Sequence, residues 1–218
     1  MISRAFELPE LINKTPKQLG YHFPAEFALH EATWLSWPHK EESWPGKIAA
    51  IYPAYSQFVK VLAQSEKVRI NVSNEQVKAF AIQHLERAGV TLGQVEFFLH
   101  PTNDAWCRDH GPAFLVNAKG KYKKAIVDWG YNAWGGKYPP FDFDDVIPTL
   151  IGKSLSLPVF YPGIVMEGGS VEFNGAGTVL TSTCCLLNEN RNPYLNQQQI
   201  ENYLAEYYGI DQVLWVDE

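Results

Sequence analysis

The sequence predicts an α/β fold built from repeated units. Segments with apolar residues at every third or fourth position alternate with short runs rich in Val, Ile and aromatic residues. The order helix, strand, strand, strand occurs twice, and a third unit begins with a helix and one strand. Such periods are typical of radial or stacked repeats, in which each unit covers its neighbour's apolar edge.

A repeat that stops within a unit leaves an unpaired sheet edge. We therefore expect residues 1–218 to form one incomplete domain, which contains about three units of a larger closed architecture. The alternative is a complete three-layer α/β protein whose last strand is terminal.

The first predicted unit begins with a strand at 31–37, where apolar and polar residues alternate. Apolar residues over 48–62 then form the stripe of an amphipathic helix. Pro53 lies within this stripe and predicts a kink or a late helix start. A short β-rich run follows at 68–72.

The second unit begins at Asn74, a plausible N-cap for a helix that ends at Gly89. Three strands are predicted after it, at 95–99, 113–117 and 122–128.

A loop rich in glycine and aromatic residues covers 129–140, and Asp144 and Asp145 suit the first turn of a helix over 144–151. Asn174-Gly175 predicts a hairpin turn. The remaining predicted strands are 159–161, 165–173, 178–183 and 212–216. Asn196 and Gln199 form a capping box for a helix that ends at Gly209.

The composition of the chain excludes several classes of protein function. With 46% hydrophobic and 19% charged residues, the chain is expected to fold, and its net charge of −6 argues against a nucleic-acid partner. No apolar stretch approaches the length of a membrane span, and Met1–Glu7 lacks a signal-peptide pattern. We therefore expect no membrane partner and a cytoplasmic location.

The three cysteines, Cys107, Cys184 and Cys185, show neither a disulfide framework nor zinc-site spacing. Cys184 and Cys185 in a strand would point to opposite faces, so they could not both bind one metal from the same side. The cysteine pattern therefore predicts neither a disulfide framework nor a zinc site.

The most informative residues are Asp109 and Glu167, each at the start of a predicted hairpin that follows a helix–strand pair. A carboxylate beside Trp, Gly and Pro is poorly placed for packing but well placed to bind a cation. Since a closed repeat brings equivalent positions together near its axis, we expect both carboxylates to line one pocket for a small positively charged group.

Asp109 and Glu167 each also have a simpler, purely structural interpretation. Asp109 could form a structural salt bridge with Arg108, although strand alternation would place the two side chains on opposite faces. Glu167 and Gly168 could belong to a strand bulge. Against these, Trp106 offers a flat face for a planar cation, and Gly168 permits close approach of backbone or ligand. From the residues alone, the reaction stays open.

Taken together, several segments resemble the agmatine deiminase family, also called bacterial-type peptidylarginine deiminases. The similar segments are 31–38, 103–112, 132–140, 167–170 and 185–193. The resemblance implies a five-bladed α/β propeller of the pentein type. It also implies a hydrolase that converts a guanidinium group to a ureido group with release of ammonia, without a metal or an organic cofactor.

In that family, a cysteine thiolate attacks the guanidinium carbon, a histidine acts as acid and base, and carboxylates bind the cation. By resemblance, Asp109 is a guanidinium-binding carboxylate, Glu167 is the glutamate near the reacting centre, and Trp106 is a wall of the substrate channel. Gly168 is counted with the substrate-binding residues. The pattern at 169–175 varies in the family, so Glu172 and Asn174 are given no role.

The family's Gly-His-x-Asp segment and its nucleophilic cysteine do not occur in the 218 residues. We therefore expect this chain to be inactive, or nearly so, by itself. The alternatives are a non-catalytic module that binds guanidinium groups or polyamines, and a fragment completed by a C-terminal partner chain. The choice among agmatine, arginine and peptidyl arginine stays open, as does a homo-oligomer.

Overall fold

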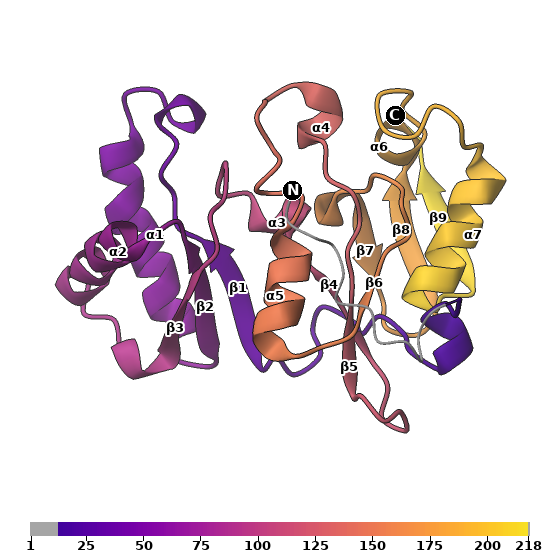
Figure 1. Ribbon diagram of the computed structural model, residues 1–218, viewed down its shortest axis with the longest axis horizontal. Helices are drawn as coiled ribbons and strands as arrows, with labels where there is room; N and C mark the ends of the chain where they lie inside the picture. Colours follow the sequence, from indigo (N-terminus) through magenta and orange to yellow (C-terminus); the bar gives the residue numbers. More distant parts are fainter. Residues whose placement is uncertain (1–12, 218) are drawn as a thin grey trace. The chain divides into compact units, whose positions relative to one another are not determined.

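In the computed structural model, which describes residues 13–217, the strands form three three-stranded sheets (Figure 1). The predicted α/β class with about three repeats is confirmed. The chain divides into two compact units. Unit 2 comprises Leu29–Cys107 and Pro140–Asp144, and unit 1 comprises Met1–Ala28, Arg108–Pro139 and Asp145–Glu218. The segment Met1–Glu7, whose sequence lacks a signal-peptide pattern, lies outside the described residues.

Unit 2 contains a parallel sheet with the order β1 (Ala32–Ser36), β2 (Lys67–Val72) and β3 (Val95–Leu99). The connections between these strands contain α1 (Ile48–Leu62) and α2 (Glu75–Arg87), together with two short 3-10 turns (Glu41–Ser43 and Leu92–Gln94). Parallel neighbours require crossover connections, which these helices supply. The buried core is formed by Trp37, Val59, Ala63, Val68, Ile70, Val72, Ala81, Leu85 and Val90.

The local signals in unit 2 agree with the structure at both helices. The Asn74 side chain accepts a hydrogen bond from the Val77 N–H at 2.9 Å, which confirms the predicted N-cap. Helix α1 already begins at Ile48 and continues through Pro53, so the alternative of a late start is wrong.

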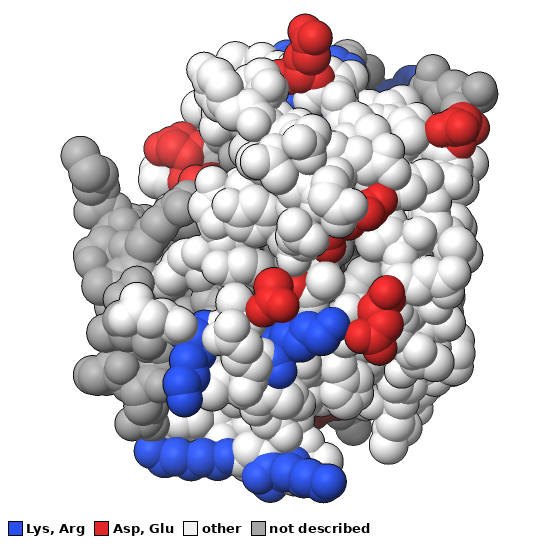
Figure 2. Space-filling view, turned by 90° about the vertical axis from the view of Figure 1, so that its right-hand side faces the viewer, with Lys and Arg blue, Asp and Glu red and all other residues white. Residues whose placement is uncertain are grey.

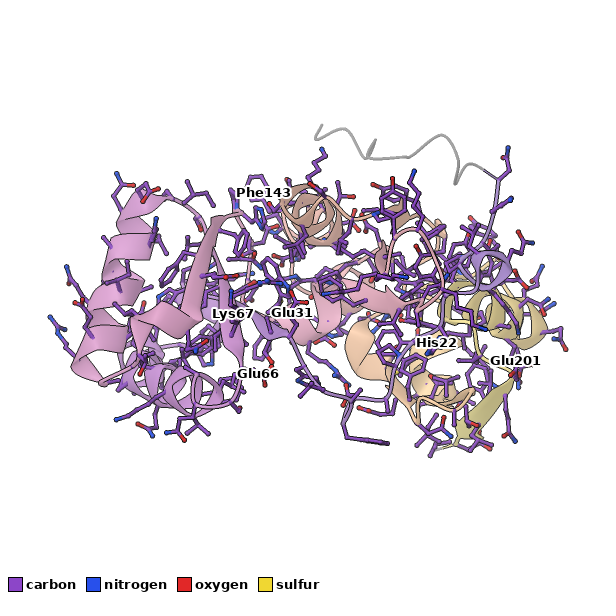
Figure 3. The ribbon with its side chains drawn as sticks, turned by 90° about the horizontal axis from the view of Figure 1, so that it is seen from below. His22, Glu31, Glu66, Lys67, Phe143 and Glu201 are labelled. Atoms are coloured by element: carbon purple, nitrogen blue, oxygen red, sulfur yellow. The ribbon has the colours of Figure 1, made fainter. Side chains whose placement is uncertain are left out.

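Charged residues join the strands of this sheet at its surface. Arg69 Nε lies 2.7 Å from Glu96 Oε2, and Lys67 Nζ lies 2.6 Å from Glu96 Oε1. A second bond joins Arg69 to Glu31 at 3.2 Å. Glu31, Glu66 and Lys67 lie close together in Figure 3. Such surface pairs contribute little to stability individually.

Unit 1 contains the other two sheets. In the first, β4 (Ala113–Val116) and β5 (Lys124–Val127) form an antiparallel hairpin, and β6 (Val159–Phe160) pairs parallel with β5 after α5 (Ile147–Leu155). In the second, β7 (Val171–Phe173) and β8 (Thr178–Ser182) form the hairpin, and β9 (Gln212–Val216) pairs parallel with β8 after α7 (Gln197–Tyr208). The shorter helices and turns are η2 (Lys17–Leu19), α3 (Cys107–His110), α4 (Ala133–Gly136), η5 (Gly168–Ser170) and α6 (Thr183–Leu186).

This pairing corrects the predicted boundaries of the repeat. The order of elements in the sequence predicts that residues 212–216 belong to a third, unfinished unit, but β9 completes the sheet begun by β7 and β8. Both sheets of unit 1 are built in the order strand, strand, helix, strand. The prediction was wrong because the linear order of elements does not reveal which strands share hydrogen bonds.

Several elements also differ from expectation, most of them by a few residues at their ends. The strand expected over 165–173 covers only Val171–Phe173, because the backbone turns at η5, where Ser170 N–H donates to the Glu167 carbonyl at 3.0 Å. The helix expected from Asp144 begins at Ile147. Finally, Cys184 and Cys185 lie in α6 rather than in a strand, and their sulfurs are 3.9 Å apart, so their expected separation onto opposite faces is wrong.

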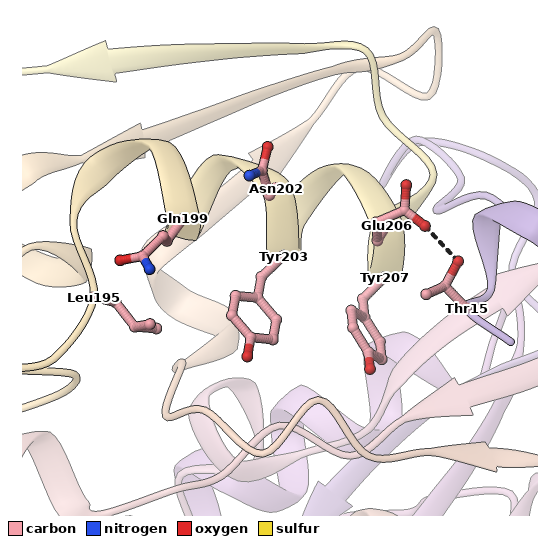
Figure 4. Close-up of a pocket in the computed structure, with 7 residues that line it drawn as sticks. All are labelled: Thr15, Leu195, Gln199, Asn202, Tyr203, Glu206 and Tyr207. Atoms are coloured by element: carbon pink, nitrogen blue, oxygen red, sulfur yellow. Dashed lines mark hydrogen bonds between the residues drawn. The ribbon is translucent and has the colours of Figure 1, made fainter. Parts of the chain in front are cut away.

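Helix α7 has both predicted caps. Asn196 and Gln199 form the reciprocal capping box, and the helix ends at Gly209, which has a φ of 65°. A hollow along this helix is shown in Figure 4, where the Thr15 hydroxyl donates to the Glu206 carboxylate at 2.5 Å. Its other lining residues are Leu195, Gln199, Asn202, Tyr203 and Tyr207.

The face over α7 and β9 displays both signs of charge, with the basic side chains gathered toward one edge (Figure 2). Among the residues that the structure describes, no helix combines the length and apolar character needed to cross a membrane.

Candidate active site

The candidate site in unit 1 is built from two short segments, each directly before a hairpin. Asp109 lies in α3, which precedes β4, and Glu167 immediately precedes η5 and β7. The prediction that each carboxylate stands at the start of a hairpin is therefore confirmed. The two hairpins occupy equivalent positions in the two sheets of this unit.

The two segments touch through a hydrogen bond between backbone and side chain. The Gly169 N–H donates to Asp109 Oδ1 at 3.1 Å. A Cβ atom on Gly169 would overlap this same oxygen, and one on Gly168 would overlap the Arg108 carbonyl. The glycine pair therefore permits close approach of the two acidic segments, which is the property expected of Gly168 from the sequence.

Burial and the neighbouring groups together raise the pKa of the Asp109 carboxyl. Burial raises its pKa, the Gly169 N–H opposes that change, the Glu167 carboxylate raises it further, and Arg108 lowers it. The influence of Glu167 means that the two carboxylates lie within electrostatic range of each other. The structure thus brings together the two acidic residues that the sequence singled out.

Arg108 binds other carboxylates. Its guanidinium forms ion pairs with Glu26 and with Glu172, the latter at 2.8 Å. Because Arg108 and Asp109 lie in α3, the strand alternation expected for them is wrong. Glu172, which received no role in the sequence analysis, helps to hold this arginine.

Glu167 is only 2% exposed and has a cation in direct contact. Its Oε1 accepts a hydrogen bond from Arg191 Nε at 2.6 Å, and both side chains are almost completely buried. Its Oε2 has no hydrogen-bond partner within the described structure. One oxygen is therefore held in place, and the other keeps its capacity to accept a hydrogen bond.

Arg191 received no role from the sequence, although it lies in the family-like segment 185–193. Two hydrogen bonds hold this segment next to Glu167. Asn192 Oδ1 accepts from Val165 N–H at 2.9 Å, and Asn192 Nδ2 donates to the Val165 carbonyl at 2.8 Å. A signal was present in the sequence: Arg191 is the only Lys or Arg after Lys153, and a buried glutamate needs a nearby cation.

Trp106 belongs to unit 2, where its ring lies 5.6 Å from that of Trp44 and the residue is 39% exposed. Cys107, in the same unit, has a pKa raised to about 12 by burial, so its sulfur is a thiol at neutral pH. Burial lowers the pKa of His100 to about 4, which makes this imidazole neutral at pH 7.

Comparison with known protein families matches residues 22–218 to the Porphyromonas-type peptidyl-arginine deiminases. The chain belongs to this family. Among the curated relatives, the agmatine deiminase of Ectopseudomonas mendocina (strain ymp) is 37% identical over 212 residues, which cover 95% of this chain and 55% of that protein. That of Stutzerimonas stutzeri (strain A1501) is 36% identical, over 94% of this chain and 55% of that protein.

Solved structures of the family agree with the fold. The agmatine deiminase of Enterococcus faecalis superposes with a TM-score of 0.87 at 33% identity, over 95% of this chain and 56% of that one. A substrate-bound agmatine deiminase of C. jejuni gives a TM-score of 0.79 at 32% identity, over 90% of this chain and 56% of that one. The family member described here therefore has the pentein fold of these enzymes over little more than half of their length.

Proposed function

We propose that this chain supplies the carboxylate part of a guanidinium-hydrolysing site of the agmatine deiminase type. In that reaction, water replaces one guanidinium nitrogen, which leaves as ammonia, and agmatine becomes N-carbamoylputrescine. The main support is the contact between the two acidic segments, in which the Gly169 N–H bonds to Asp109 two residues after Glu167.

Each carboxylate has a different role in this proposal. Asp109 is partly buried, and its carboxylate would accept N–H groups of the guanidinium plane. Glu167 would accept through Oε2, while Arg191 holds its Oε1 in a fixed orientation. Gly168 keeps the two segments in contact, and Trp106, in unit 2, is proposed as a wall of the substrate channel on the family resemblance alone.

Two of the three cysteines of this chain, Cys107 and Cys185, fit the attacking role poorly. A nucleophilic cysteine needs a thiolate, but burial raises the pKa of both Cys107 and Cys185. We therefore propose that neither thiol attacks the guanidinium carbon, and that the 218-residue chain binds substrate with little or no turnover.

Calorimetric titration of the purified chain with agmatine tests the binding. Putrescine, which has amino groups but no guanidinium, is the matched ligand control. Asp109→Asn should weaken agmatine binding by about 10- to 100-fold, because it removes a charge-assisted hydrogen bond. Asp211→Asn, which changes a surface carboxylate that is paired with Lys17, is the matched protein control.

Equal affinity for agmatine and putrescine, or equal agmatine affinity in wild type and Asp109→Asn, would contradict the proposed binding. A separate assay follows formation of the ureido product. If the chain turned agmatine over while Cys107→Ser, Cys184→Ser and Cys185→Ser each stayed active, the proposed lack of turnover would be wrong.

A further inference from the structure

Two adjacent cysteines, Cys184 and Cys185, precede the segment that contains Arg191 and have no role in the proposed reaction. Cys184 and Cys185 belong to α6, directly after β8, and their sulfurs are 3.9 Å apart. Cys184 is exposed, with its sulfur 2.7 Å from the Ser182 hydroxyl, while Cys185 is partly buried. The pair is therefore an accessible dithiol whose sulfurs already face each other.

The Cys185 thiol interacts electrostatically with two residues of the candidate site. Burial and the neighbouring Cys184 raise the pKa of Cys185, the Glu167 carboxylate raises it further, and the Arg191 guanidinium lowers it. Cys185 thus lies within range of both members of the buried ion pair.

Hydrogen bonds also connect the cysteine backbone to Arg191. Asn188 Nδ2 donates to the Cys184 carbonyl at 3.3 Å, and Asn188 N–H donates to the Cys185 carbonyl at 3.4 Å. The Arg191 N–H then donates to the Asn188 carbonyl at 3.0 Å. The conformation of α6 therefore contributes to the position from which Arg191 reaches Glu167.

We propose that Cys184 and Cys185 form a redox modification site, at which a small disulfide converts the dithiol into a disulfide between adjacent residues. Adjacent Cα atoms are about 3.8 Å apart, which is shorter than the usual spacing across a disulfide. The α6 backbone must therefore change conformation when the bond forms, and the Asn188 hydrogen bonds to its carbonyls are lost. Strained and exposed disulfides are easily reduced, so the modification is reversible.

The chemistry balances in two exchange steps. The Cys184 thiolate, having lost its proton to water, attacks one sulfur of the small disulfide and expels the first thiol. Cys185 then loses its proton, attacks the Cys184 sulfur and expels the second thiol. Two electrons pass from the cysteine pair to the small disulfide, which is reduced to two thiols.

The consequence for the site rests on the proposed function. Displacement of Arg191 leaves Glu167 buried without its cation, and an unpaired buried carboxylate takes up a proton. A neutral Glu167 attracts a guanidinium group less strongly. The oxidised chain is therefore expected to bind agmatine about 10-fold more weakly than the reduced chain.

Oxidised glutathione is the probe for the modification itself. After incubation, mass spectrometry of the intact chain should show the loss of two hydrogens, located in the peptide that contains both cysteines and reversed by dithiothreitol. Cys184→Ser, which changes the exposed member, should abolish this product, while Cys107→Ser should retain it. A stable glutathione adduct on the wild type, or no change of mass, would overturn the proposal.

The free energy of unfolding, measured for the wild type and for Arg191→Ala, tests the link to Arg191. Oxidation should lower the free energy of unfolding of the wild type but change that of Arg191→Ala much less, because the ion pair is already absent. Equal effects in both proteins would overturn the link. If the reduced chain does not bind agmatine at all, the proposed function fails, whereas the mass and unfolding measurements still decide the redox proposal.

Discussion

Each unit contains a buried carboxylate, and the two carboxylates are equally buried but bonded to different kinds of group. Glu167 and Asp144 are each 2% exposed. Glu167 has the Arg191 guanidinium at 2.6 Å. Asp144 accepts the backbone N–H groups of Asn103 and Asp104, at 2.8 and 3.3 Å.

The backbone N–H groups do not compensate for the burial of Asp144. Burial raises its pKa to about 7, and the neighbouring Asp104 carboxylate adds to the change, although both N–H groups and Lys40 oppose it. Lys40 lies 3.8 Å from Asp104. For Asp144, burial therefore outweighs two backbone hydrogen bonds and the attraction of a lysine, whereas the buried Glu167 carboxylate has a guanidinium in direct contact.

The largest expected effect on stability comes from removal of the Arg191 guanidinium, which contacts Glu167. Arg191→Ala should lower the free energy of unfolding by about 3–5 kcal/mol, because it leaves Glu167 buried and unpaired. Urea denaturation measures the change.

The matched control is Lys78→Ala, which removes an exposed ion pair with Glu75 and should cost less than about 1 kcal/mol. Adding Glu167→Gln to Arg191→Ala should recover part of the loss. A cost for Arg191→Ala no larger than that of the control would show that the buried pair is not a major stabilising contact.

The second effect is the pH dependence that Asp144 imposes. Since its pKa is raised in the folded state, the unfolded chain releases this proton first, and stability should fall as pH rises from about 4 to about 7. The decline should not exceed about 4 kcal/mol. Asp144→Asn keeps an acceptor oxygen for the two N–H groups and should remove the decline.

Denaturation curves recorded across this pH range check the prediction, with the exposed Asp142→Asn as control. If Asp144→Asn and the wild type had the same pH dependence, the Asp144 carboxyl would have to titrate normally.

The smallest effect on stability is expected at Asp109, which is partly buried and accepts one backbone N–H. Asp109→Asn retains that acceptor and removes a carboxylate whose pKa is raised, so stability at pH 7 should change by less than about 1 kcal/mol. Thermal melting checks this. A large loss of stability would mean that weaker agmatine binding by this variant reports unfolding rather than a missing contact.

Helix caps and turns, which depend on residues only a few positions apart, were predictable from the sequence by itself. Asn74 caps α2 through an N–H three residues away, and Asn196 and Gln199 cap α7 over the same spacing. Asn174 likewise closes the β7–β8 hairpin by accepting from Ala176 and Thr178. In such cases, donor and acceptor are brought together by the local geometry of a helix or turn.

The contacts that build the site were decided only by the tertiary structure. Glu167 meets Arg191 across 24 positions of sequence, and Asp109 meets Gly169 across 60. The pairing of β8 with β9, which sets the repeat boundaries, likewise spans a whole helix. Local propensity contains no information about such partners, because their energies depend on which distant segments are packed together when water is excluded.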